Sequence, residues 1–143
     1  ILDLNKTYEV LETLGVPVIT LGQVMLPAFW SSTSDLASPL RMDKVADIAK
    51  AQKMRTEMGL SGGQLVCNPI PKDAEIAANV LTPVIAQALA EADAQGINAK
   101  GVTPFLLGRI FELTEGRSLT ANIALVRNNA RVAAQIAVEL GKL

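Results

Sequence analysis

Apolar and polar positions along the chain predict helices that alternate with short buried strands. Residues 3–14 carry apolar side chains at helical spacing between an N-cap residue, Asp3, and a stop signal, Gly15. The next segment, 16–21, is short, rich in β-branched residues and almost wholly apolar, as expected for a strand covered on both faces. This order of helix, glycine and buried strand is typical of layered α/β folds.

The middle of the chain combines a long irregular segment with a second helix and a second strand. Residues 22–40 contain two prolines and a run of Ser and Thr, which predicts an irregular excursion. Loops of this length are often functional lids or subunit contacts, and others are disordered. Residues 42–59 predict a helix that ends at Gly59, and residues 64–68 predict a second buried strand.

The final third is predicted to be helical. Two Thr-Pro pairs, at 82–83 and 103–104, each combine an N-cap with a proline at the first helical position, which predicts helices ending at Gly96 and Gly116. Ser118 is expected to cap a last long helix. The apolar stripe along this helix consists of Leu119, Ile123, Val126, Ala130, Ala133 and Ile136. Since no repeat or linker divides the chain, one domain-sized unit is expected.

Composition removes several classes of function. The chain has no histidine, which excludes Ser-His and Cys-His pairs, imidazole bases and His-rich metal sites. A formal net charge of -1 provides no basic surface for a phosphate backbone, so no nucleic-acid partner is expected. Cys67 is the only cysteine, which favours a reducing compartment such as the cytoplasm. No signal-peptide pattern or apolar run of about 18 residues occurs, so no membrane partner is expected.

Two turn motifs beside the second predicted strand offer polar groups. Ser61-Gly62-Gly63 precedes the strand and could present backbone amides to an anion. It lacks the spacing of a P-loop, however, and the alternative is a tight turn. Asn68-Pro69 follows the strand, at the edge where open α/β sheets place ligands, although Asn-Pro is also a common turn initiator.

Asparagines interrupt the apolar pattern of the last predicted helix. Asn122 and Asn129 are seven residues apart and therefore lie nearly on one face. Because asparagine is a poor helix former and a buried amide needs partners, these side chains face either backbone groups or a ligand. The lysines and carboxylates lie in polar settings, and none stands out as a nucleophile or an acid and base pair.

Several long strings, in the same order along essentially the whole chain, resemble the pseudouridine-5'-phosphate glycosidase family. They are ILDLNKTYEVLETLGVPVI, LPAFW, GLSGGQLVCNPIP, AEADAQGI, VTPFLLGRIFELTEGRSLTANIALVRNNAR and AAQIAVEL. The resemblance implies an α/β/α sandwich in which residues 1–143 form the C-terminal half of a single domain. It also implies reversible cleavage of pseudouridine 5'-phosphate to uracil and ribose 5-phosphate by a homotrimer that uses a divalent metal such as Mn²⁺.

The resemblance further implies where the chemistry resides. In the family a lysine attacks the sugar C1' and opens the ring to a Schiff-base-like adduct, while a glutamate transfers protons. The match at residues 1–3 puts this lysine two positions before Ile1, and the glutamate and a metal-binding aspartate belong to the N-terminal half. In this chain the resemblance assigns substrate contact to Asn122. Weaker motif matches add Thr103, Asn68, Ser61, Gly62 and Asn129. Residues 20–25 depart from the family's Gly-Tyr-Gln-Thr-like stretch. Contacts that the family makes through the loop that follows are therefore not carried over to this chain.

Three hypotheses are compatible with these sequence features. In the first, the chain is the C-terminal half of an active glycosidase, has the N-terminal half as its partner and is inactive alone. In the second, it is a noncatalytic assembly module, either a natural fragment or a degenerate paralogue that keeps the trimer surface. In the third, it belongs to another sugar-phosphate enzyme on a similar layered sheet, because a fold alone does not determine a function.

Overall fold

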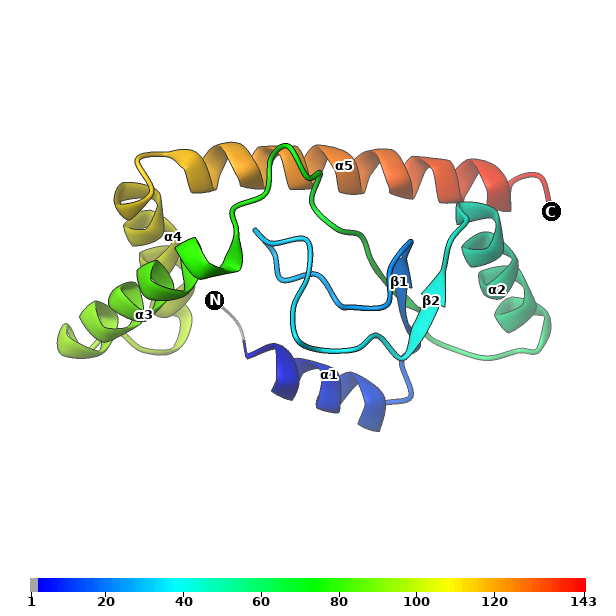
Figure 1. The fold of residues 1–143 in the computed structure, drawn as a ribbon. Coiled ribbons are helices and arrows are strands. Elements are labelled where there is room, and N and C mark those ends of the chain that lie inside the picture. Colours follow the sequence, from blue (N-terminus) through cyan, green and yellow to red (C-terminus); the bar gives the residue numbers. More distant parts are fainter. Residues whose placement is uncertain (1–2) are drawn as a thin grey trace.

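The computed structural model describes residues 3–143 and has helices on both sides of a small parallel sheet (Figure 1). Helix α1 lies on one side of the strands, and the long helix α5 lies on the other. This arrangement confirms the predicted layered α/β fold. The elements are α1 Leu4–Thr13, β1 Val18–Leu21, β2 Leu40–Met42, α2 Val45–Glu57, β3 Leu65–Cys67, α3 Ala78–Ala94, the 3₁₀ turn η1 Ala99–Gly101, α4 Val102–Leu113 and α5 Arg117–Leu140.

The sheet has the order β2-β1-β3, with β1 parallel to both neighbours. Strand β1 is buried over its first three residues, which confirms the prediction for residues 16–21. Strand β3 lies where the second strand was predicted, but its predicted burial is wrong because Leu65 is 38% exposed and only Cys67 is buried. Within residues 3–143, β3 has a neighbour on one side only, which leaves part of it uncovered.

The sequence pattern missed strand β2. Its three residues, Leu40–Met42, alternate apolar and charged side chains, but a run of three that follows a proline is too short for its period to be recognised. Parallel pairing with β1 organises them instead, with Ile19 opposite Leu40. The predicted helix at residues 42–59 is present as α2, but it begins at Val45 because the strand occupies the preceding residues.

Two helices begin earlier than their Thr-Pro pairs predicted. Helix α3 begins at Ala78, and Thr82 donates its hydroxyl to the Ala78 carbonyl at 2.8 Å instead of capping the helix. Pro83 lies inside α3, where burial of Leu81 in the core stabilises the turn before it. Helix α4 begins at Val102, ahead of its Thr-Pro pair, so that its proline falls in the first turn, where a backbone N–H has no intrahelical acceptor.

The N-terminal caps of α1 and α5 were both predicted from the sequence. Asp3 caps α1 by accepting a hydrogen bond from the Lys6 amide at 3.1 Å, as predicted. The predicted cap of α5 at Ser118 is wrong, because Gly116 is the N-cap, with a φ of 83° that favours glycine. Ser118 is a buried residue of the first helical turn.

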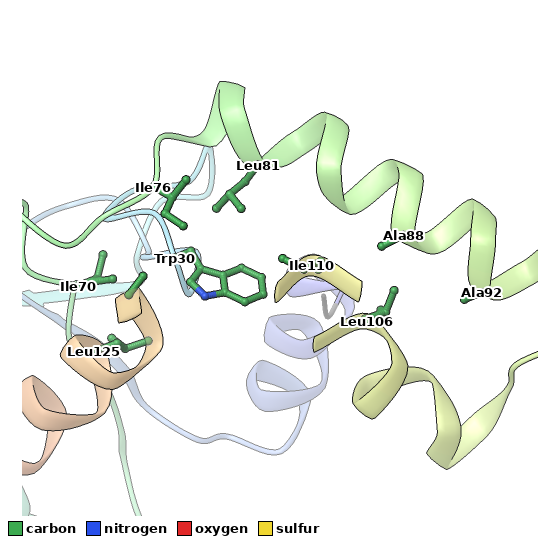
Figure 2. Close-up of a cluster of buried hydrophobic side chains, with 10 residues drawn as sticks. Trp30, Ile70, Ile76, Leu81, Ala88, Ala92, Leu106, Ile110 and Leu125 are labelled. Carbon is green, nitrogen blue, oxygen red and sulfur yellow. The ribbon is translucent and has the colours of Figure 1, made fainter. Parts of the chain in front are cut away.

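The interior contains two clusters of buried side chains, and Ile19, Ile48 and Ala49 are buried outside both. The helical cluster joins α3, α4 and α5 around Trp30 (Figure 2). Its buried members are Trp30, Ile70, Ile76, Leu81, Ala88, Ala92, Leu106, Ile110, Ala121 and Leu125. The sheet cluster contains Val18, Leu26 and Cys67, with partly buried side chains of α1 packed against them. None of the helices within residues 3–143 has the length and apolar character needed to cross a membrane.

Candidate functional site

Trp30 joins the irregular segment 22–40 to the helices. Its indole is 2% exposed and donates from Nε1 to the Ser118 carbonyl of α5 at 2.9 Å. The Trp30 carbonyl accepts from the Ile76 amide at 2.9 Å, and the Ser31 hydroxyl donates to the Ile76 carbonyl at 2.8 Å. These hydrogen bonds attach the segment to α5 and to the connection that precedes α3.

Glu75 adds a charged contact to this attachment. The Ser32 amide donates to Glu75 Oε2 at 2.9 Å. Hydrogen bonding from Ser32 lowers the pKa of the Glu75 carboxyl, and the charge of nearby Lys72 contributes in the same direction. Glu75 is therefore held as a carboxylate that positions the backbone at Ser32. It does not line either of the two cavities described next.

Two neighbouring cavities flank Trp30. The first, of about 490 Å³, is mostly apolar, and Leu4, Phe29, Leu81 and Leu107 are among its walls. The second, of about 350 Å³, lies where α4 meets α5. Its lining consists of Trp30, Leu107, Phe111, Ser118, Leu119 and Asn122. Because Trp30 and Leu107 line both, the cavities form one continuous region of the surface.

Each cavity receives one of the predicted substrate-binding residues. Thr103, in the first turn of α4, lines the larger cavity, and Asn122 of α5 lines the smaller one. Among residues 3–143 the Asn122 side chain makes no hydrogen bond, although it lies in a half-buried position. A half-buried amide that faces a cavity can both donate to and accept from a bound polar group.

Asn68 and Asn129 are brought together away from Asn122. Asn68 Nδ2 donates to Asn129 Oδ1 at 3.0 Å, so each amide supplies a partner for the other. Next to them, Asn128 Nδ2 donates to the Pro69 carbonyl at 3.0 Å and ties the turn to α5. Asn129 lies about 10 Å along the helix axis from Asn122, at 1.5 Å per residue. The Asn68–Asn129 pair is therefore not part of the lining of either cavity.

Ser61 and Gly62 lie at the other end of strand β3. They precede β3, whereas Asn68 follows it, so the length of the strand separates them. Gly62 has a φ of 83°, and the Ser61 carbonyl accepts a hydrogen bond from Arg55 Nη2 at 3.3 Å. This geometry is that of an exposed tight turn. The structure does not bring Ser61 or Gly62 to the cavities, and their proposed contact with substrate stays a prediction.

Sequence reasoning did not identify the aromatic pair at the centre of the site. Phe29 and Trp30 meet edge to face with their ring centroids 4.6 Å apart. Phe29 has a φ of 57°, an unfavourable backbone conformation for a bulky side chain, and such strain is often found at ligand sites. The string LPAFW contributed only to the resemblance. The available signal was the single tryptophan of the chain, placed in a segment without predicted structure.

The expected metal ligand, an aspartate, belongs to the N-terminal half and not to this chain. Within residues 3–143 no three His, Cys, Asp or Glu side chains gather in an arrangement that could hold an ion. Cys67 is buried, and burial raises the pKa of its thiol, which disfavours the thiolate needed for metal binding. Mn²⁺ binding by an aspartate of the N-terminal half stays a prediction.

Comparisons with known proteins bear on this site. The family model described as indigoidine synthase A like protein matches residues 1–139. A pseudouridine-5'-phosphate glycosidase of Paracoccus denitrificans (strain Pd 1222) is 69% identical over 140 residues, which cover 98% of this chain and 46% of the relative. The enzyme of the same name from Jannaschia sp. (strain CCS1) is 63% identical over 137 residues, with 96% and 45% covered.

Solved structures agree with these relatives. The prealnumycin C-glycosynthase AlnA, in complex with ribulose 5-phosphate, superposes with a TM-score of 0.89 at 31% identity, covering 98% of this chain and 46% of that one. An indigoidine synthase A-like protein from Thermotoga maritima gives a TM-score of 0.85 at 35% identity, with the same coverage. The chain thus spans about half the length of the proteins it matches. It belongs to the indigoidine synthase A-like family.

Proposed function

We propose that the chain is one half of an enzyme that reversibly cleaves the C-glycosidic bond of pseudouridine 5'-phosphate to uracil and ribose 5-phosphate. The observation that carries this proposal is the 69% identity, over 98% of this chain, to a relative named for that activity. At that identity a fold is retained closely, and the residues that line a site can be compared one by one.

Asn122 is proposed to hydrogen-bond the bound nucleotide or the ring-opened sugar. Its amide faces the smaller cavity and makes no hydrogen bond among residues 3–143, so binding would satisfy it. Thr103 would add a hydroxyl in the larger cavity. The apolar walls around Trp30 would exclude water from the flat faces of the base.

The covalent step is proposed to depend on a lysine outside this chain. The resemblance puts it two positions before Ile1, hence five positions before Leu4, which lines the larger cavity together with Thr103. Five residues span at most about 17 Å, so the lysine would lie within reach of the cavity region. Its amine would attack C1' and open the ring, and a glutamate of the N-terminal half would transfer protons. We further propose that the enzyme uses Mn²⁺, assembles as a homotrimer and is located in the cytoplasm.

A second candidate is the formation of a C-glycoside with a different acceptor. The solved C-glycosynthase has the same fold over 98% of this chain, and its structure contains ribulose 5-phosphate. Its identity of 31% is less than half of that to the Paracoccus enzyme, and for this reason the glycosidase is preferred. Assay of the reverse reaction with several acceptors in place of uracil would identify this alternative.

The test is uracil release from pseudouridine 5'-phosphate, measured by chromatography. The chain alone is expected to release none. A chimera in which this chain replaces the matched 46% of the Paracoccus enzyme is expected to be active. Uracil release by the chain alone would show that no other half is needed. A folded chimera without activity, beside an active parent enzyme, would favour the noncatalytic assembly module.

Asn122→Ala in the chimera tests the substrate contact. Loss of one hydrogen bond to a neutral group should lower kcat/KM by about two- to tenfold, equivalent to about 0.5 to 1.5 kcal/mol. Asn98→Ala is the control, because Asn98 is exposed and its side chain makes no cap hydrogen bond. Equal kinetics for both variants would leave Asn122 with a packing role only.

A further inference from the structure

Helix α5 is apolar on two faces. Ala121, Leu125 and Val132 face the interior and are buried. A second series, which we name the outer stripe, follows helical spacing on another side of the helix and is exposed. It consists of Leu119, Ile123, Val126, Ala130, Ala133 and Ala137. A helix at a protein surface normally has charged residues opposite its buried face, whereas a helix that is apolar on both sides lies between two layers.

The outer stripe contains no charge over a considerable length. From Leu119 to Ala137 it extends about 27 Å at 1.5 Å per residue. The charged residues of this stretch, Arg127 and Arg131, fall outside the stripe's spacing of three and four residues. An uninterrupted apolar surface of this length favours a protein partner with an apolar face of its own.

The outer stripe is continuous with the candidate site. Leu107 and Phe111 of α4, both partly exposed, line the smaller cavity together with Leu119 and Asn122. Asn122 directly precedes Ile123 of the stripe. A polypeptide that covers the stripe would therefore also close the cavity that contains the Asn122 amide.

We propose that the outer stripe binds the portion of the enzyme that this chain does not match in its relatives, and that this docking completes the cavity at Asn122. The proposal rests on the proposed function for the role of Asn122, but the docking surface can be tested without any activity. The solved C-glycosynthase contains this half as 46% of its chain, so more than half of that chain lies outside the matched region and must pack against it somewhere. The length, exposure and lack of charge of the outer stripe make it suited to that contact.

Cysteine accessibility at two valines of α5 tests the proposal. Val126 in the stripe is 57% exposed and Val138 outside it is 59% exposed, so they form a matched pair. Val126→Cys and Val138→Cys are placed both in this chain and in the Paracoccus chimera. Thiol labelling is then followed by mass spectrometry of peptides. In the chimera, labelling at position 126 should slow at least about tenfold relative to the chain alone, because docking buries it. Labelling at position 138 should change less than about twofold.

Two outcomes would overturn the proposal. Labelling of Val126→Cys in the folded chimera at the same rate as Val138→Cys would show that the stripe stays uncovered. Protection at position 126 that disappears when the chimera is diluted to monomers, as seen by light scattering, would assign the stripe to a second copy. A protected stripe in a chimera that releases no uracil would contradict the proposed function and leave the docking surface in place.

Discussion

The helical cluster and the sheet cluster differ in how completely this chain forms them. The helical cluster contains ten buried side chains, Trp30 included, and the sheet cluster contains only three. On the strands, Leu40 is 45% and Leu65 is 38% exposed. Parallel sheets are normally covered on both faces, because their crossover connections place helices there. This chain therefore supplies a nearly complete core at its helical end and an incomplete one at its sheet.

The largest effect is expected from removing the centre of the helical cluster. Trp30→Ala should lower the free energy of unfolding by about 3 to 5 kcal/mol, because it leaves a cavity and removes the hydrogen bond to Ser118. Urea unfolding followed by far-UV circular dichroism measures this loss. Fluorescence would fail, since Trp30 is the only tryptophan.

Trp30→Phe provides the control for this variant. It keeps an aromatic ring in the cluster and loses the indole N–H, so its cost should be smaller than that of Trp30→Ala. If Trp30→Ala unfolded at the same urea concentration as the unmodified chain, the helical cluster would not be the main source of stability.

An intermediate effect is expected at the sheet cluster, where Cys67 serves as a probe. The thiol is buried, its pKa is raised by burial, and the Tyr8 hydroxyl lies 3.7 Å from Sγ. Labelling therefore requires opening of the contact between α1 and the sheet. Tyr8→Ala should accelerate labelling by about tenfold, equivalent to about 1.4 kcal/mol of opening free energy.

The same probe tests whether the two clusters are independent. If the sheet cluster opens locally, Trp30→Phe should leave the labelling rate of Cys67 within about twofold of that of the unmodified chain. If Tyr8→Ala and Trp30→Phe accelerated the labelling of Cys67 equally, the two clusters would open together. They would then not differ in stability.

The smallest effect is expected at the ion pair that joins α3 to α4. Arg109 donates from Nε and Nη2 to the Glu91 carboxylate, and this hydrogen bonding lowers the pKa of Glu91. A lowered pKa stabilises the fold above the ordinary glutamate pKa of about 4.3, and this stabilisation is lost as the pH falls through the lowered value. Glu91→Gln should therefore lower Tm by about 2 °C or less at pH 7 and change nothing at strongly acidic pH.

Glu112→Gln is the control for the ion pair, because Glu112 makes a single contact with Arg109 at 2.7 Å and is more exposed. Its effect on Tm, measured by differential scanning calorimetry at both pH values, should be smaller still. A larger effect at acidic pH than at pH 7 would contradict the sign given for Glu91.

Periodicity predicted the elements whose own residues carry a helical or apolar pattern. The first helix with its Asp3 cap, the buried strand β1, the helix α2 and the helical final third all appear. Strand β2 escaped prediction because pairing with β1 creates it, and a three-residue strand has no period to detect. The starts of α3 and α4 were placed too late. In α3 the buried Leu81 lies before the Thr-Pro pair, and in α4 the helix begins one residue before its pair, at Val102.

The candidate site was predicted in part. Asn122 and Thr103, taken from the resemblance, line neighbouring cavities, while Asn68 pairs with Asn129. Trp30 and Phe29 were not predicted, because no local pattern marks a side chain whose partners are far along the chain. The indole of Trp30 donates to Ser118, 88 residues later.

By itself, the sequence determined the alternation of helices and strands, the absence of histidine chemistry and the family resemblance. Each of these depends on residue identity and on spacing along the chain. The tertiary structure alone decided which apolar face of α5 is buried, because both faces satisfy the helical period. It also placed Asn122 at the border between the buried face and the outer stripe. Burial depends on which elements meet in space, and local spacing does not specify that.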